Sequence, residues 1–437
     1  MKADNSKSRP KKIPNQADQR LTTVNLREIV WAMSDMLDLV GVDDFYHGKR
    51  VAYMAIECMR LHSAGTPWDS LLVATHDASL LHDCGVSSTI LHKKIVAELD
   101  WEQSHIHCER GHALLVKQPL LAHLAPVVLA HHTHWQDLTD TPATEEARLL
   151  ANCIYMADRI DSLATGYAPH ELLLQCREIR KIIAGYRGRM FAPQLVDTFL
   201  TISENENFWL TFFAPHIDSY FKELHIPLRE QRVDSKTLRE IAALFADIVD
   251  AKSPFTAEHS LGVGLLAAYI GTLCGLDRPT CEKLELAGYL HDLGKLKVPD
   301  EILEKNGPLN VTERAIIIQH SFETYQILRR ISGFEAIARL AAFHHETLSG
   351  EGYPFHMHGT ELSIEARIIA VADIFQALAQ NRPYRSALPP EKIKTVLQNL
   401  AKADKLDPEL VALVTVNLIP CWQVATQTNT RQNESYG

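Results

Sequence analysis

Apolar residues along this chain of 437 residues recur mostly every three or four positions, which is the spacing of one helical face. In the segment TLREIAALFADIVD this face contains Leu238, Ile241, Leu244, Phe245 and Ile248. Ser235 or Thr237 is the expected N-cap of that helix. The segments LAGYLHDLG and SIEARIIAVADIFQAL show the same spacing, and Gly294 suits a helix stop. Alternating, strand-like runs are scarce, so we predict an all-α protein.

The polar, proline-containing segment HIPLREQRVDSK divides the chain into two helical halves. The length favours two or three domains, each able to bury a core. We expect an N-terminal bundle over residues 21–225 and a C-terminal bundle over residues 226–425. The basic residues 1–20 are predicted to be a disordered tail, and residues 426–437 a polar, frayed tail.

Composition and charge narrow the classes of function. The net charge of -10 argues against a broad surface for polymeric nucleic acid. The eight cysteines form no CxxC pair, which is typical of reduced thiols in a cytoplasmic protein. The start of the chain has no apolar region of a secretory signal, and no apolar run approaches the ~18 residues of a membrane span. We therefore expect a cytoplasmic protein without a membrane partner.

Residues that can bind metals occur twice in the same order. The C-terminal series is His259, His291, Asp292, His320, His344, His345 and Asp373; the N-terminal series is His47, His82, Asp83, His107, His131, His132 and Asp158. In both, the third histidine precedes the His-His pair by 24 residues. Histidine and aspartate without cysteine suit Mn, Fe or Zn, and paired ions of this kind hydrolyse phosphate esters. The duplication predicts a metal centre inside each bundle of a two-domain phosphohydrolase.

One choice in the first series depends on local similarity. His76 and Asp77 also form a His-Asp pair, but ASLLHDCGV aligns with AGYLHDLGK of the second series. This alignment favours His82 and Asp83 as the ligands.

The second half contains the segments HDLGKLKVPDEIL at 291–303, HHETLSGEGYP at 344–354 and ADIFQALAQNRPYR at 372–385. These three segments resemble those of the HD-GYP phosphodiesterases, a branch of the HD superfamily. The resemblance, which spans about residues 235–420, implies two tandem HD-type helical bundles, the first one divergent. It further implies hydrolysis of a small-molecule cyclic dinucleotide to a linear 5'-phosphorylated dinucleotide. The sequence does not choose between cyclic di-GMP and 3'3'-cyclic GMP-AMP, and it leaves a homodimer open.

Carried over to this sequence, the resemblance implies two divalent ions, Fe or Mn, in the C-terminal domain. One ion would be held by His259, His291 and Asp373, the other by His320, His344 and His345, and Asp292 would bridge them as a catalytic residue. The resemblance makes Lys295 the catalytic lysine that meets the scissile phosphate. It makes Arg382 and Arg385 phosphate-binding cations and places Tyr353 of the GYP loop at the border of the substrate cleft.

The second half departs from the family pattern at two places. Phe255 stands where some members have a carboxylate for a third metal, and Glu258 is wrongly placed to replace it. Gln376 stands where the family commonly has Asp, which affects the positioning of the last ligand.

The first half has a carboxylate at Asp43, four residues before His47, but Val86 replaces the lysine, and the GYP and RPYR segments are missing. We expect this half to bind further divalent metals and to act on another substrate. The linear dinucleotide released by the second half is one such substrate, and the reaction would be 5'-nucleotidase-like. An inactive metal-binding scaffold or dimerisation module is the alternative.

Two further hypotheses apply to the whole chain. One is a nucleotide or (p)ppGpp-type HD phosphohydrolase. The other is a sensor or adaptor that binds a cyclic dinucleotide without cleaving it.

Overall fold

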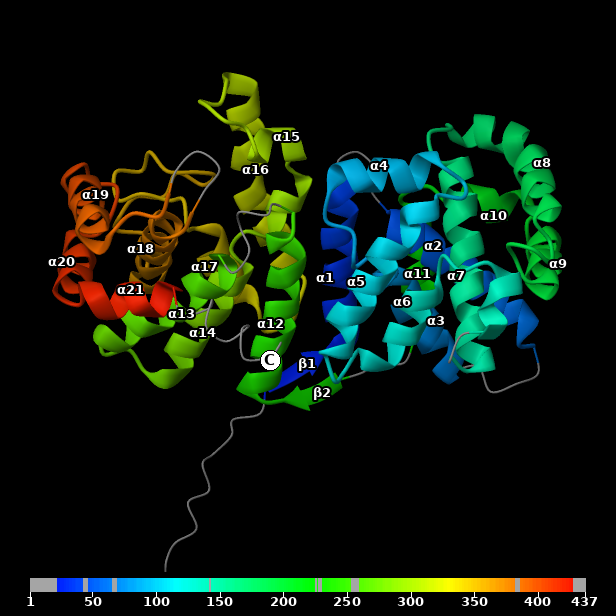
Figure 1. Cartoon of the computed structure of the whole chain (residues 1–437), viewed down its shortest axis with the longest axis horizontal. Helices are drawn as coiled ribbons and strands as arrows, with labels where there is room; N and C mark the ends of the chain where they lie inside the picture. Colours follow the sequence, from blue (N-terminus) through cyan, green and yellow to red (C-terminus); the bar gives the residue numbers. More distant parts are fainter. Residues whose placement is uncertain are drawn as a thin grey trace, which may run out of the picture.

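The computed structural model shows, in the residues that it describes, an all-α protein with one short two-stranded ribbon, which confirms the predicted fold class. It describes residues 22–41, 46–64, 69–140, 143–224, 226, 230–252, 259–381 and 386–426. The two predicted tails therefore lie almost entirely outside the described residues. Figure 1 shows the helices of the two halves of the chain gathered side by side.

The helices of the first half surround a long central helix, α7. They are α1 (Leu26–Asp38), α2 (His47–His62), α3 (Asp69–Leu81), α4 (Thr89–Ala97), α5 (His105–Val116), α6 (Ala125–Ala130), α7 (Glu145–Ala164), α8 (Pro169–Gly185), α9 (Pro193–Ile202), α10 (Glu206–Leu210) and α11 (His216–Glu223). Contacts of α7 with α2, α4, α6 and α8 bring together segments that are far apart in the sequence.

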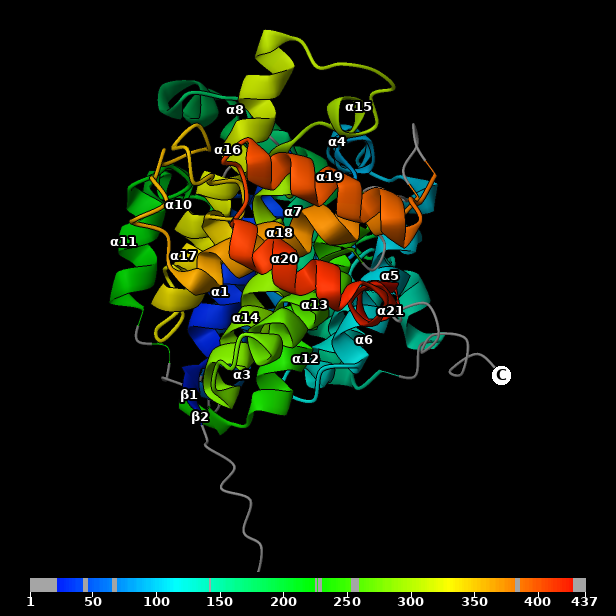
Figure 2. The same ribbon diagram turned by 90° about the vertical axis from the view of Figure 1, so that its left-hand side faces the viewer.

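The second half repeats this order of helices around α18. Its helices are α12 (Ser235–Asp250), α13 (His259–Leu273), α14 (Arg278–Leu290), α15 (Asp300–Leu303), α16 (Val311–Leu328), α17 (Glu335–Ala342), α18 (Ile364–Ala379), α19 (Pro390–Lys402), α20 (Pro408–Val416) and α21 (Leu418–Thr426). A 3-10 turn, η5 (Leu293–Lys297), follows α14. Figure 2 shows α19 and α20 on the side of the molecule that faces the viewer, beside α18, and α19, α20 and α21 all contact α18.

The predicted apolar face of α12 is buried, but its predicted N-cap is wrong. The five apolar residues from Leu238 to Ile248 are at most 7% exposed. The cap is Asp234, whose carboxylate accepts hydrogen bonds from the backbone N–H and the hydroxyl of Thr237, both at 2.8 Å. Ser235 is already the first residue of the helix.

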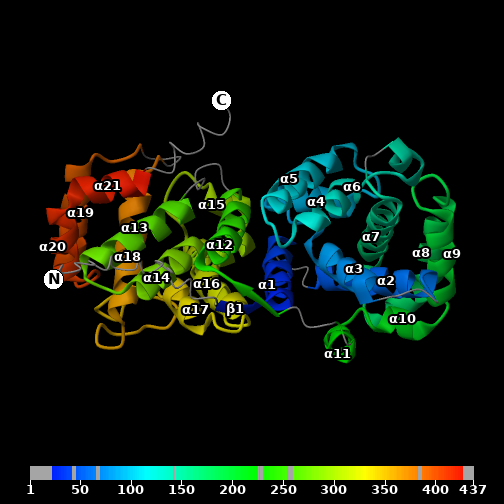
Figure 3. The same ribbon diagram turned by 90° about the horizontal axis from the view of Figure 1, so that it is seen from below.

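The first helix of each half lies at the boundary between the halves. The strand β1 (Thr22–Asn25), just before α1, pairs antiparallel with β2 (Glu230–Val233), just before α12. Helix α1 packs on α16 and η5, while backbone carbonyls of α12 accept hydrogen bonds from Arg110 and Gln118 of the first half. Figure 3 shows α1 between the two groups of helices. We keep residues 21–225 and 226–425 as the proposed domains, joined by this ribbon.

None of the described helices by itself is long and apolar enough to cross a membrane. Helices α20 and α21 reach the required length and apolar character only as a pair bent by 87°.

Candidate metal centres

The structure brings the seven predicted ligands of the second half together from five helices. His259 begins α13, His291 and Asp292 follow α14, His320 belongs to α16, His344 and His345 follow α17, and Asp373 belongs to α18. They form two groups of donor atoms, one of His259, His291 and Asp373 and the other of His320, His344 and His345.

Asp292 lies between these two groups. Its Oδ2 is 3.2 Å from Nε2 of His291, and its Oδ1 is 3.5 Å from Nε2 of His320. The two carboxylate oxygens therefore face different histidine groups, as a bridging ligand requires.

Backbone carbonyls set the orientation of several histidines. Nδ1 of His291 lies 2.8 Å from the carbonyl oxygen of Gly288, and His320 and His344 make the same contact three residues back at 2.6 Å. An Nδ1–H that donates to a carbonyl leaves Nε2 with its lone pair toward the centre. Among the described residues, Nε2 of His259, Nε2 of His291 and Oδ1 of Asp292 are buried and make no hydrogen bond, although carboxylate or imidazole atoms of the other ligands lie close to them. Because such atoms are costly to bury unpaired, these residues fit a site that holds metal ions.

At His320, His345 and Asp292 the electrostatics of the site favour the metal-binding protonation states. Burial lowers the pKa of His320 to about 3 and that of His345 to about 4, so both imidazoles are neutral. Burial alone would raise the pKa of Asp292, but His291 and Lys295 hold it well below its usual range. Neutral imidazole and ionised carboxylate are the forms that bind metals.

Lys295 and Tyr353 border this centre. Lys295 belongs to η5, and its Nζ donates to Oδ2 of Asp292. The ring of Tyr353 lies 4.7 Å from that of His345. The structure thus brings both residues to the predicted ligands, whereas Arg382, Arg385, Phe255 and Glu258 lie outside the described residues.

Glu346 is a residue of the site region that the sequence interpretation missed. Its buried carboxylate accepts hydrogen bonds from the backbone N–H groups of Phe355 and Met357 at 2.7 and 3.0 Å. It therefore closes the GYP loop onto the segment that carries His344 and His345. The only signal in the sequence was an acidic residue directly after the His-His pair.

The Gly294 helix-stop prediction is also corrected. Helix α14 ends earlier, at Leu290, and Gly294 belongs to η5. A Cβ at Gly294 would lie 2.0 Å from the carbonyl oxygen of His320. Glycine is needed there because η5 passes directly against the backbone of α16.

The seven predicted ligands of the first half converge in the same way. Donor atoms of Asp83, His107, His131 and His132 form one group, and those of His47, His82 and Asp158 form the other. Oδ1 of Asp83 is 3.3 Å from Nε2 of His107, and its Oδ2 is 3.6 Å from Nε2 of both His47 and His82. Asp83 thus occupies the position that Asp292 has in the second half.

The alternative pair, His76 and Asp77, lies away from this centre. The two side chains contact each other at 2.8 Å, and the His76 ring packs against Trp31 and Phe221. Asp43 lies outside the described residues.

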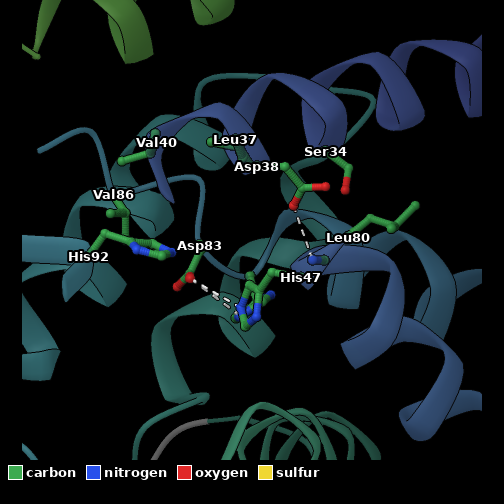
Figure 4. A pocket seen from close by; sticks show the side chains of 11 residues that line it. Ser34, Leu37, Asp38, Val40, His47, Leu80, Asp83, Val86 and His92 are labelled. Atoms are coloured by element: carbon green, nitrogen blue, oxygen red, sulfur yellow. Dashed lines mark hydrogen bonds and ion pairs between the residues drawn. The ribbon is translucent and has the colours of Figure 1, made fainter. Parts of the chain in front are cut away.

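The mouth of the first centre differs from that of the second. The pocket that His47 and Asp83 line is also lined by Val86 and His92 (Figure 4). Val86 occupies the place of Lys295, so a cation beside the bridging carboxylate is replaced by an apolar side chain. His92, whose ring is 6.4 Å from that of His47, is a residue of this pocket that the sequence interpretation did not identify.

A helical bundle with a His-Asp centre that joins five helices defines the class of HD-domain hydrolases. The HD domain family model matches residues 243–410 of this chain. The chain is 33% identical over 407 residues to the 3'3'-cGAMP-specific phosphodiesterase 1 of Vibrio cholerae, covering 92% of this chain and 94% of the relative. It therefore belongs to the HD-GYP family of cyclic dinucleotide phosphodiesterases.

Two further matches show how far this similarity extends. A crystal structure of a V. cholerae cyclic GMP-AMP-specific phosphodiesterase, V-cGAP3, matches with a TM-score of 0.62 at 25% identity, covering 91% of this chain and 99% of that chain. A cyclic di-GMP phosphodiesterase of Thermotoga maritima is 32% identical over 176 residues, covering 40% of this chain and 48% of the relative. Both halves are thus shared with the cyclic GMP-AMP enzymes.

Proposed function

We propose that this protein is a metal-dependent phosphodiesterase that hydrolyses 3'3'-cyclic GMP-AMP to a linear 5'-phosphorylated dinucleotide. The observation that carries the reaction is the position of Asp292, which faces both histidine groups and contacts Lys295. The choice of cyclic GMP-AMP over cyclic di-GMP is supported by the relative that matches both halves, because its name specifies that substrate.

The residues of the second centre have separable tasks. His259, His291 and Asp373 would hold one divalent ion, Fe or Mn, and His320, His344 and His345 would hold the other. Two such ions, when bound, lower the pKa of a bound water and stabilise the attacking and leaving oxygens.

The chain itself orients the substrate. Lys295 is about one-fifth exposed and can shift from Asp292 to an oxygen of the scissile phosphate. Arg382 and Arg385 would contact phosphates by their planar guanidinium groups, and Tyr353 would border the ring of the substrate. Hydrolysis of one phosphodiester bond then opens the cyclic dinucleotide.

The first centre is proposed as a second hydrolytic site that also binds divalent metals. All seven ligands converge there, and keeping so many buried imidazoles and carboxylates without an ion is costly. Because Val86 replaces the lysine, we propose a different substrate for it: the linear product, from which it would remove the terminal phosphate. A metal-binding scaffold without activity is the alternative.

Product analysis of two variants tests this division of labour. Each purified full-length protein is incubated with 3'3'-cyclic GMP-AMP, and products are separated over time. His291→Ala should block ring opening, whereas His82→Ala should open the ring and accumulate the 5'-phosphorylated linear dinucleotide. His112→Ala, half-buried in α5 outside the ligand set, is the matched control. Identical product profiles for His291→Ala and His82→Ala would contradict two separate activities, and bound metal without turnover in the wild type would support a sensor.

The eight cysteines all have free thiols, which supports the proposed cytoplasmic location. A homodimer is a further proposal, which the mass of the protein in solution tests.

A further inference from the structure

The first histidine of each series is oriented differently from the histidines held by backbone carbonyls. His47 and His259 begin the equivalent helices α2 and α13. In both, Nδ1 contacts a side chain located three residues after the last aspartate ligand. This partner is Asp161 in the first half and Gln376 in the second, at 2.7 and 2.5 Å. The same position therefore has a carboxylate in one centre and an amide in the other.

Asp161 is an ionised partner. It is 1% exposed, and its carboxylate also accepts hydrogen bonds from Nε of Arg50 at 2.5 Å and Nη2 at 2.9 Å. A carboxylate on Nδ1–H increases the electron density at Nε2, so it makes His47 a stronger metal ligand.

Gln376 is a neutral partner in a closed space. It is 0% exposed, and its Nε2 has no hydrogen-bond partner among the described residues. A Cβ at Gly262 would lie 2.6 Å from that Nε2, so glycine makes the room that the amide occupies. For His259 to offer Nε2 to an ion, Nδ1 must carry the proton, and Oε1 of Gln376 is the acceptor that fixes this tautomer.

We propose that Gln376 is a positioning residue that orients His259 and makes the His259–His291–Asp373 subsite bind its ion more weakly than the His47–His82–Asp158 subsite. This inference rests on the metal ligand sets proposed above. Replacing the residue that accepts a hydrogen bond from the other ring nitrogen of a metal-binding histidine typically changes metal affinity by about 10- to 100-fold. The first half would then keep its ion at metal concentrations at which the second half loses one.

Metal retention, without any activity measurement, tests the inference. Full-length protein is loaded with Mn²⁺, dialysed against rising concentrations of a chelator, and its bound manganese is counted by elemental analysis. The wild type should release one ion before the others. Gln376→Asp should move this first release to about 10-fold higher chelator or more, and Asp161→Asn should create an additional early release.

A matched control excludes a general effect of added charge. Gln423→Asp adds a carboxylate at an exposed position of α21 and should release manganese like the wild type. An unchanged release curve for a folded Gln376→Asp would overturn the inference while leaving the metal centres intact. Should Gln376→Asp fail to fold, Gln376→Glu and Asp161→Asn provide the same comparison. Failure of the wild type to retain any Mn²⁺ would contradict the proposed manganese sites as well as this inference.

Discussion

A buried ion pair at the boundary between the halves offers a sharp test of how they are held together. Nζ of Lys252 is 3.1 Å from Oδ1 of Asp300 and donates to Oγ1 of Thr89 at 3.0 Å. Oδ2 of Asp300 accepts hydrogen bonds from Oγ of Ser88 at 2.8 Å and from the backbone N–H of Ile90 at 3.3 Å. The lysine and aspartate side chains are 1% and 8% exposed. The pair therefore fastens the segment after η5 to the start of α4.

The magnitude follows from what each substitution leaves behind. Removing one partner of a buried ion pair costs about 3–5 kcal/mol, because the other charge remains buried. In each single variant, the charged residue that remains keeps its neutral partners from the first half. We therefore expect Lys252→Met and Asp300→Asn each to lose stability at the lower end of this range, about 3 kcal/mol. The double variant leaves neither charge unpaired. Its loss should be smaller than the sum of the two single losses by about 1–3 kcal/mol.

Urea unfolding of the wild type, the two single variants and the double variant measures this coupling. Where the two halves unfold in separate transitions, the first transition is the one compared. Lys394→Met, which breaks an exposed contact with Glu391, is the control and should cost under about 0.5 kcal/mol. A stability loss of the double variant that equals the sum of the two single losses within about 0.5 kcal/mol would refute the reasoning.

The same pair predicts a pH dependence of stability. Burial alone would raise the pKa of Asp300, but Lys252 and the hydrogen bonds from Ser88 and Ile90 lower it below the usual value. A depressed aspartate pKa stabilises the folded state above the unfolded pKa of about 3.9 and loses this effect as the pH falls further. The stability advantage of the wild type over Asp300→Asn should therefore shrink below about pH 4.

Three other predictions concern the metal centres and the close contact at η5. Chelation should lower the melting temperature and abolish hydrolysis, and added Mn²⁺ should restore both, as thermal unfolding and product analysis can show. Lys295→Ala should lower kcat/KM by about 10²–10³-fold while bound metal, counted by elemental analysis, stays unchanged. Gly294→Ala should cost about 3 kcal/mol in urea unfolding, because its Cβ would meet the backbone of His320, whereas Gly185→Ala, with nothing within 4 Å of its Cβ, should cost nothing.

The sequence predicted what depends on local spacing and on residue chemistry. Helical periodicity predicted the apolar face of α12, and the repeated order of histidine and aspartate predicted which residues converge. The cap of α12 was missed because Asp234, Ser235 and Thr237 are all good N-cap residues, and only the packing of the helix selects among them.

Contacts between distant segments were beyond the reach of the sequence. The pairing of β1 with β2 joins residues about 200 positions apart, and short polar strands such as TTVN and EQRV have no strong strand signal. Glu346 and Asp161 were missed for a related reason. Their role depends on which backbone N–H or imidazole folds against them, and the residue type alone does not reveal this.

The neutralising cations of the two centres differ in their exposure to solvent. In the first half, Arg159 is 1% exposed, and its Nη2 donates a hydrogen bond to Oδ2 of Asp158 at 2.7 Å. Its Nη1 donates to the backbone carbonyls of Ile95 and Glu98. These contacts keep the guanidinium buried, so it stabilises the carboxylate but cannot reach a substrate. In the second half, Lys295 is partly exposed and contacts the carboxylate of Asp292, so its ammonium group can turn toward an incoming phosphate. With the metal sites proposed above, we therefore expect phosphate contact in the first half to come chiefly from the ions, and in the second half from Lys295 as well.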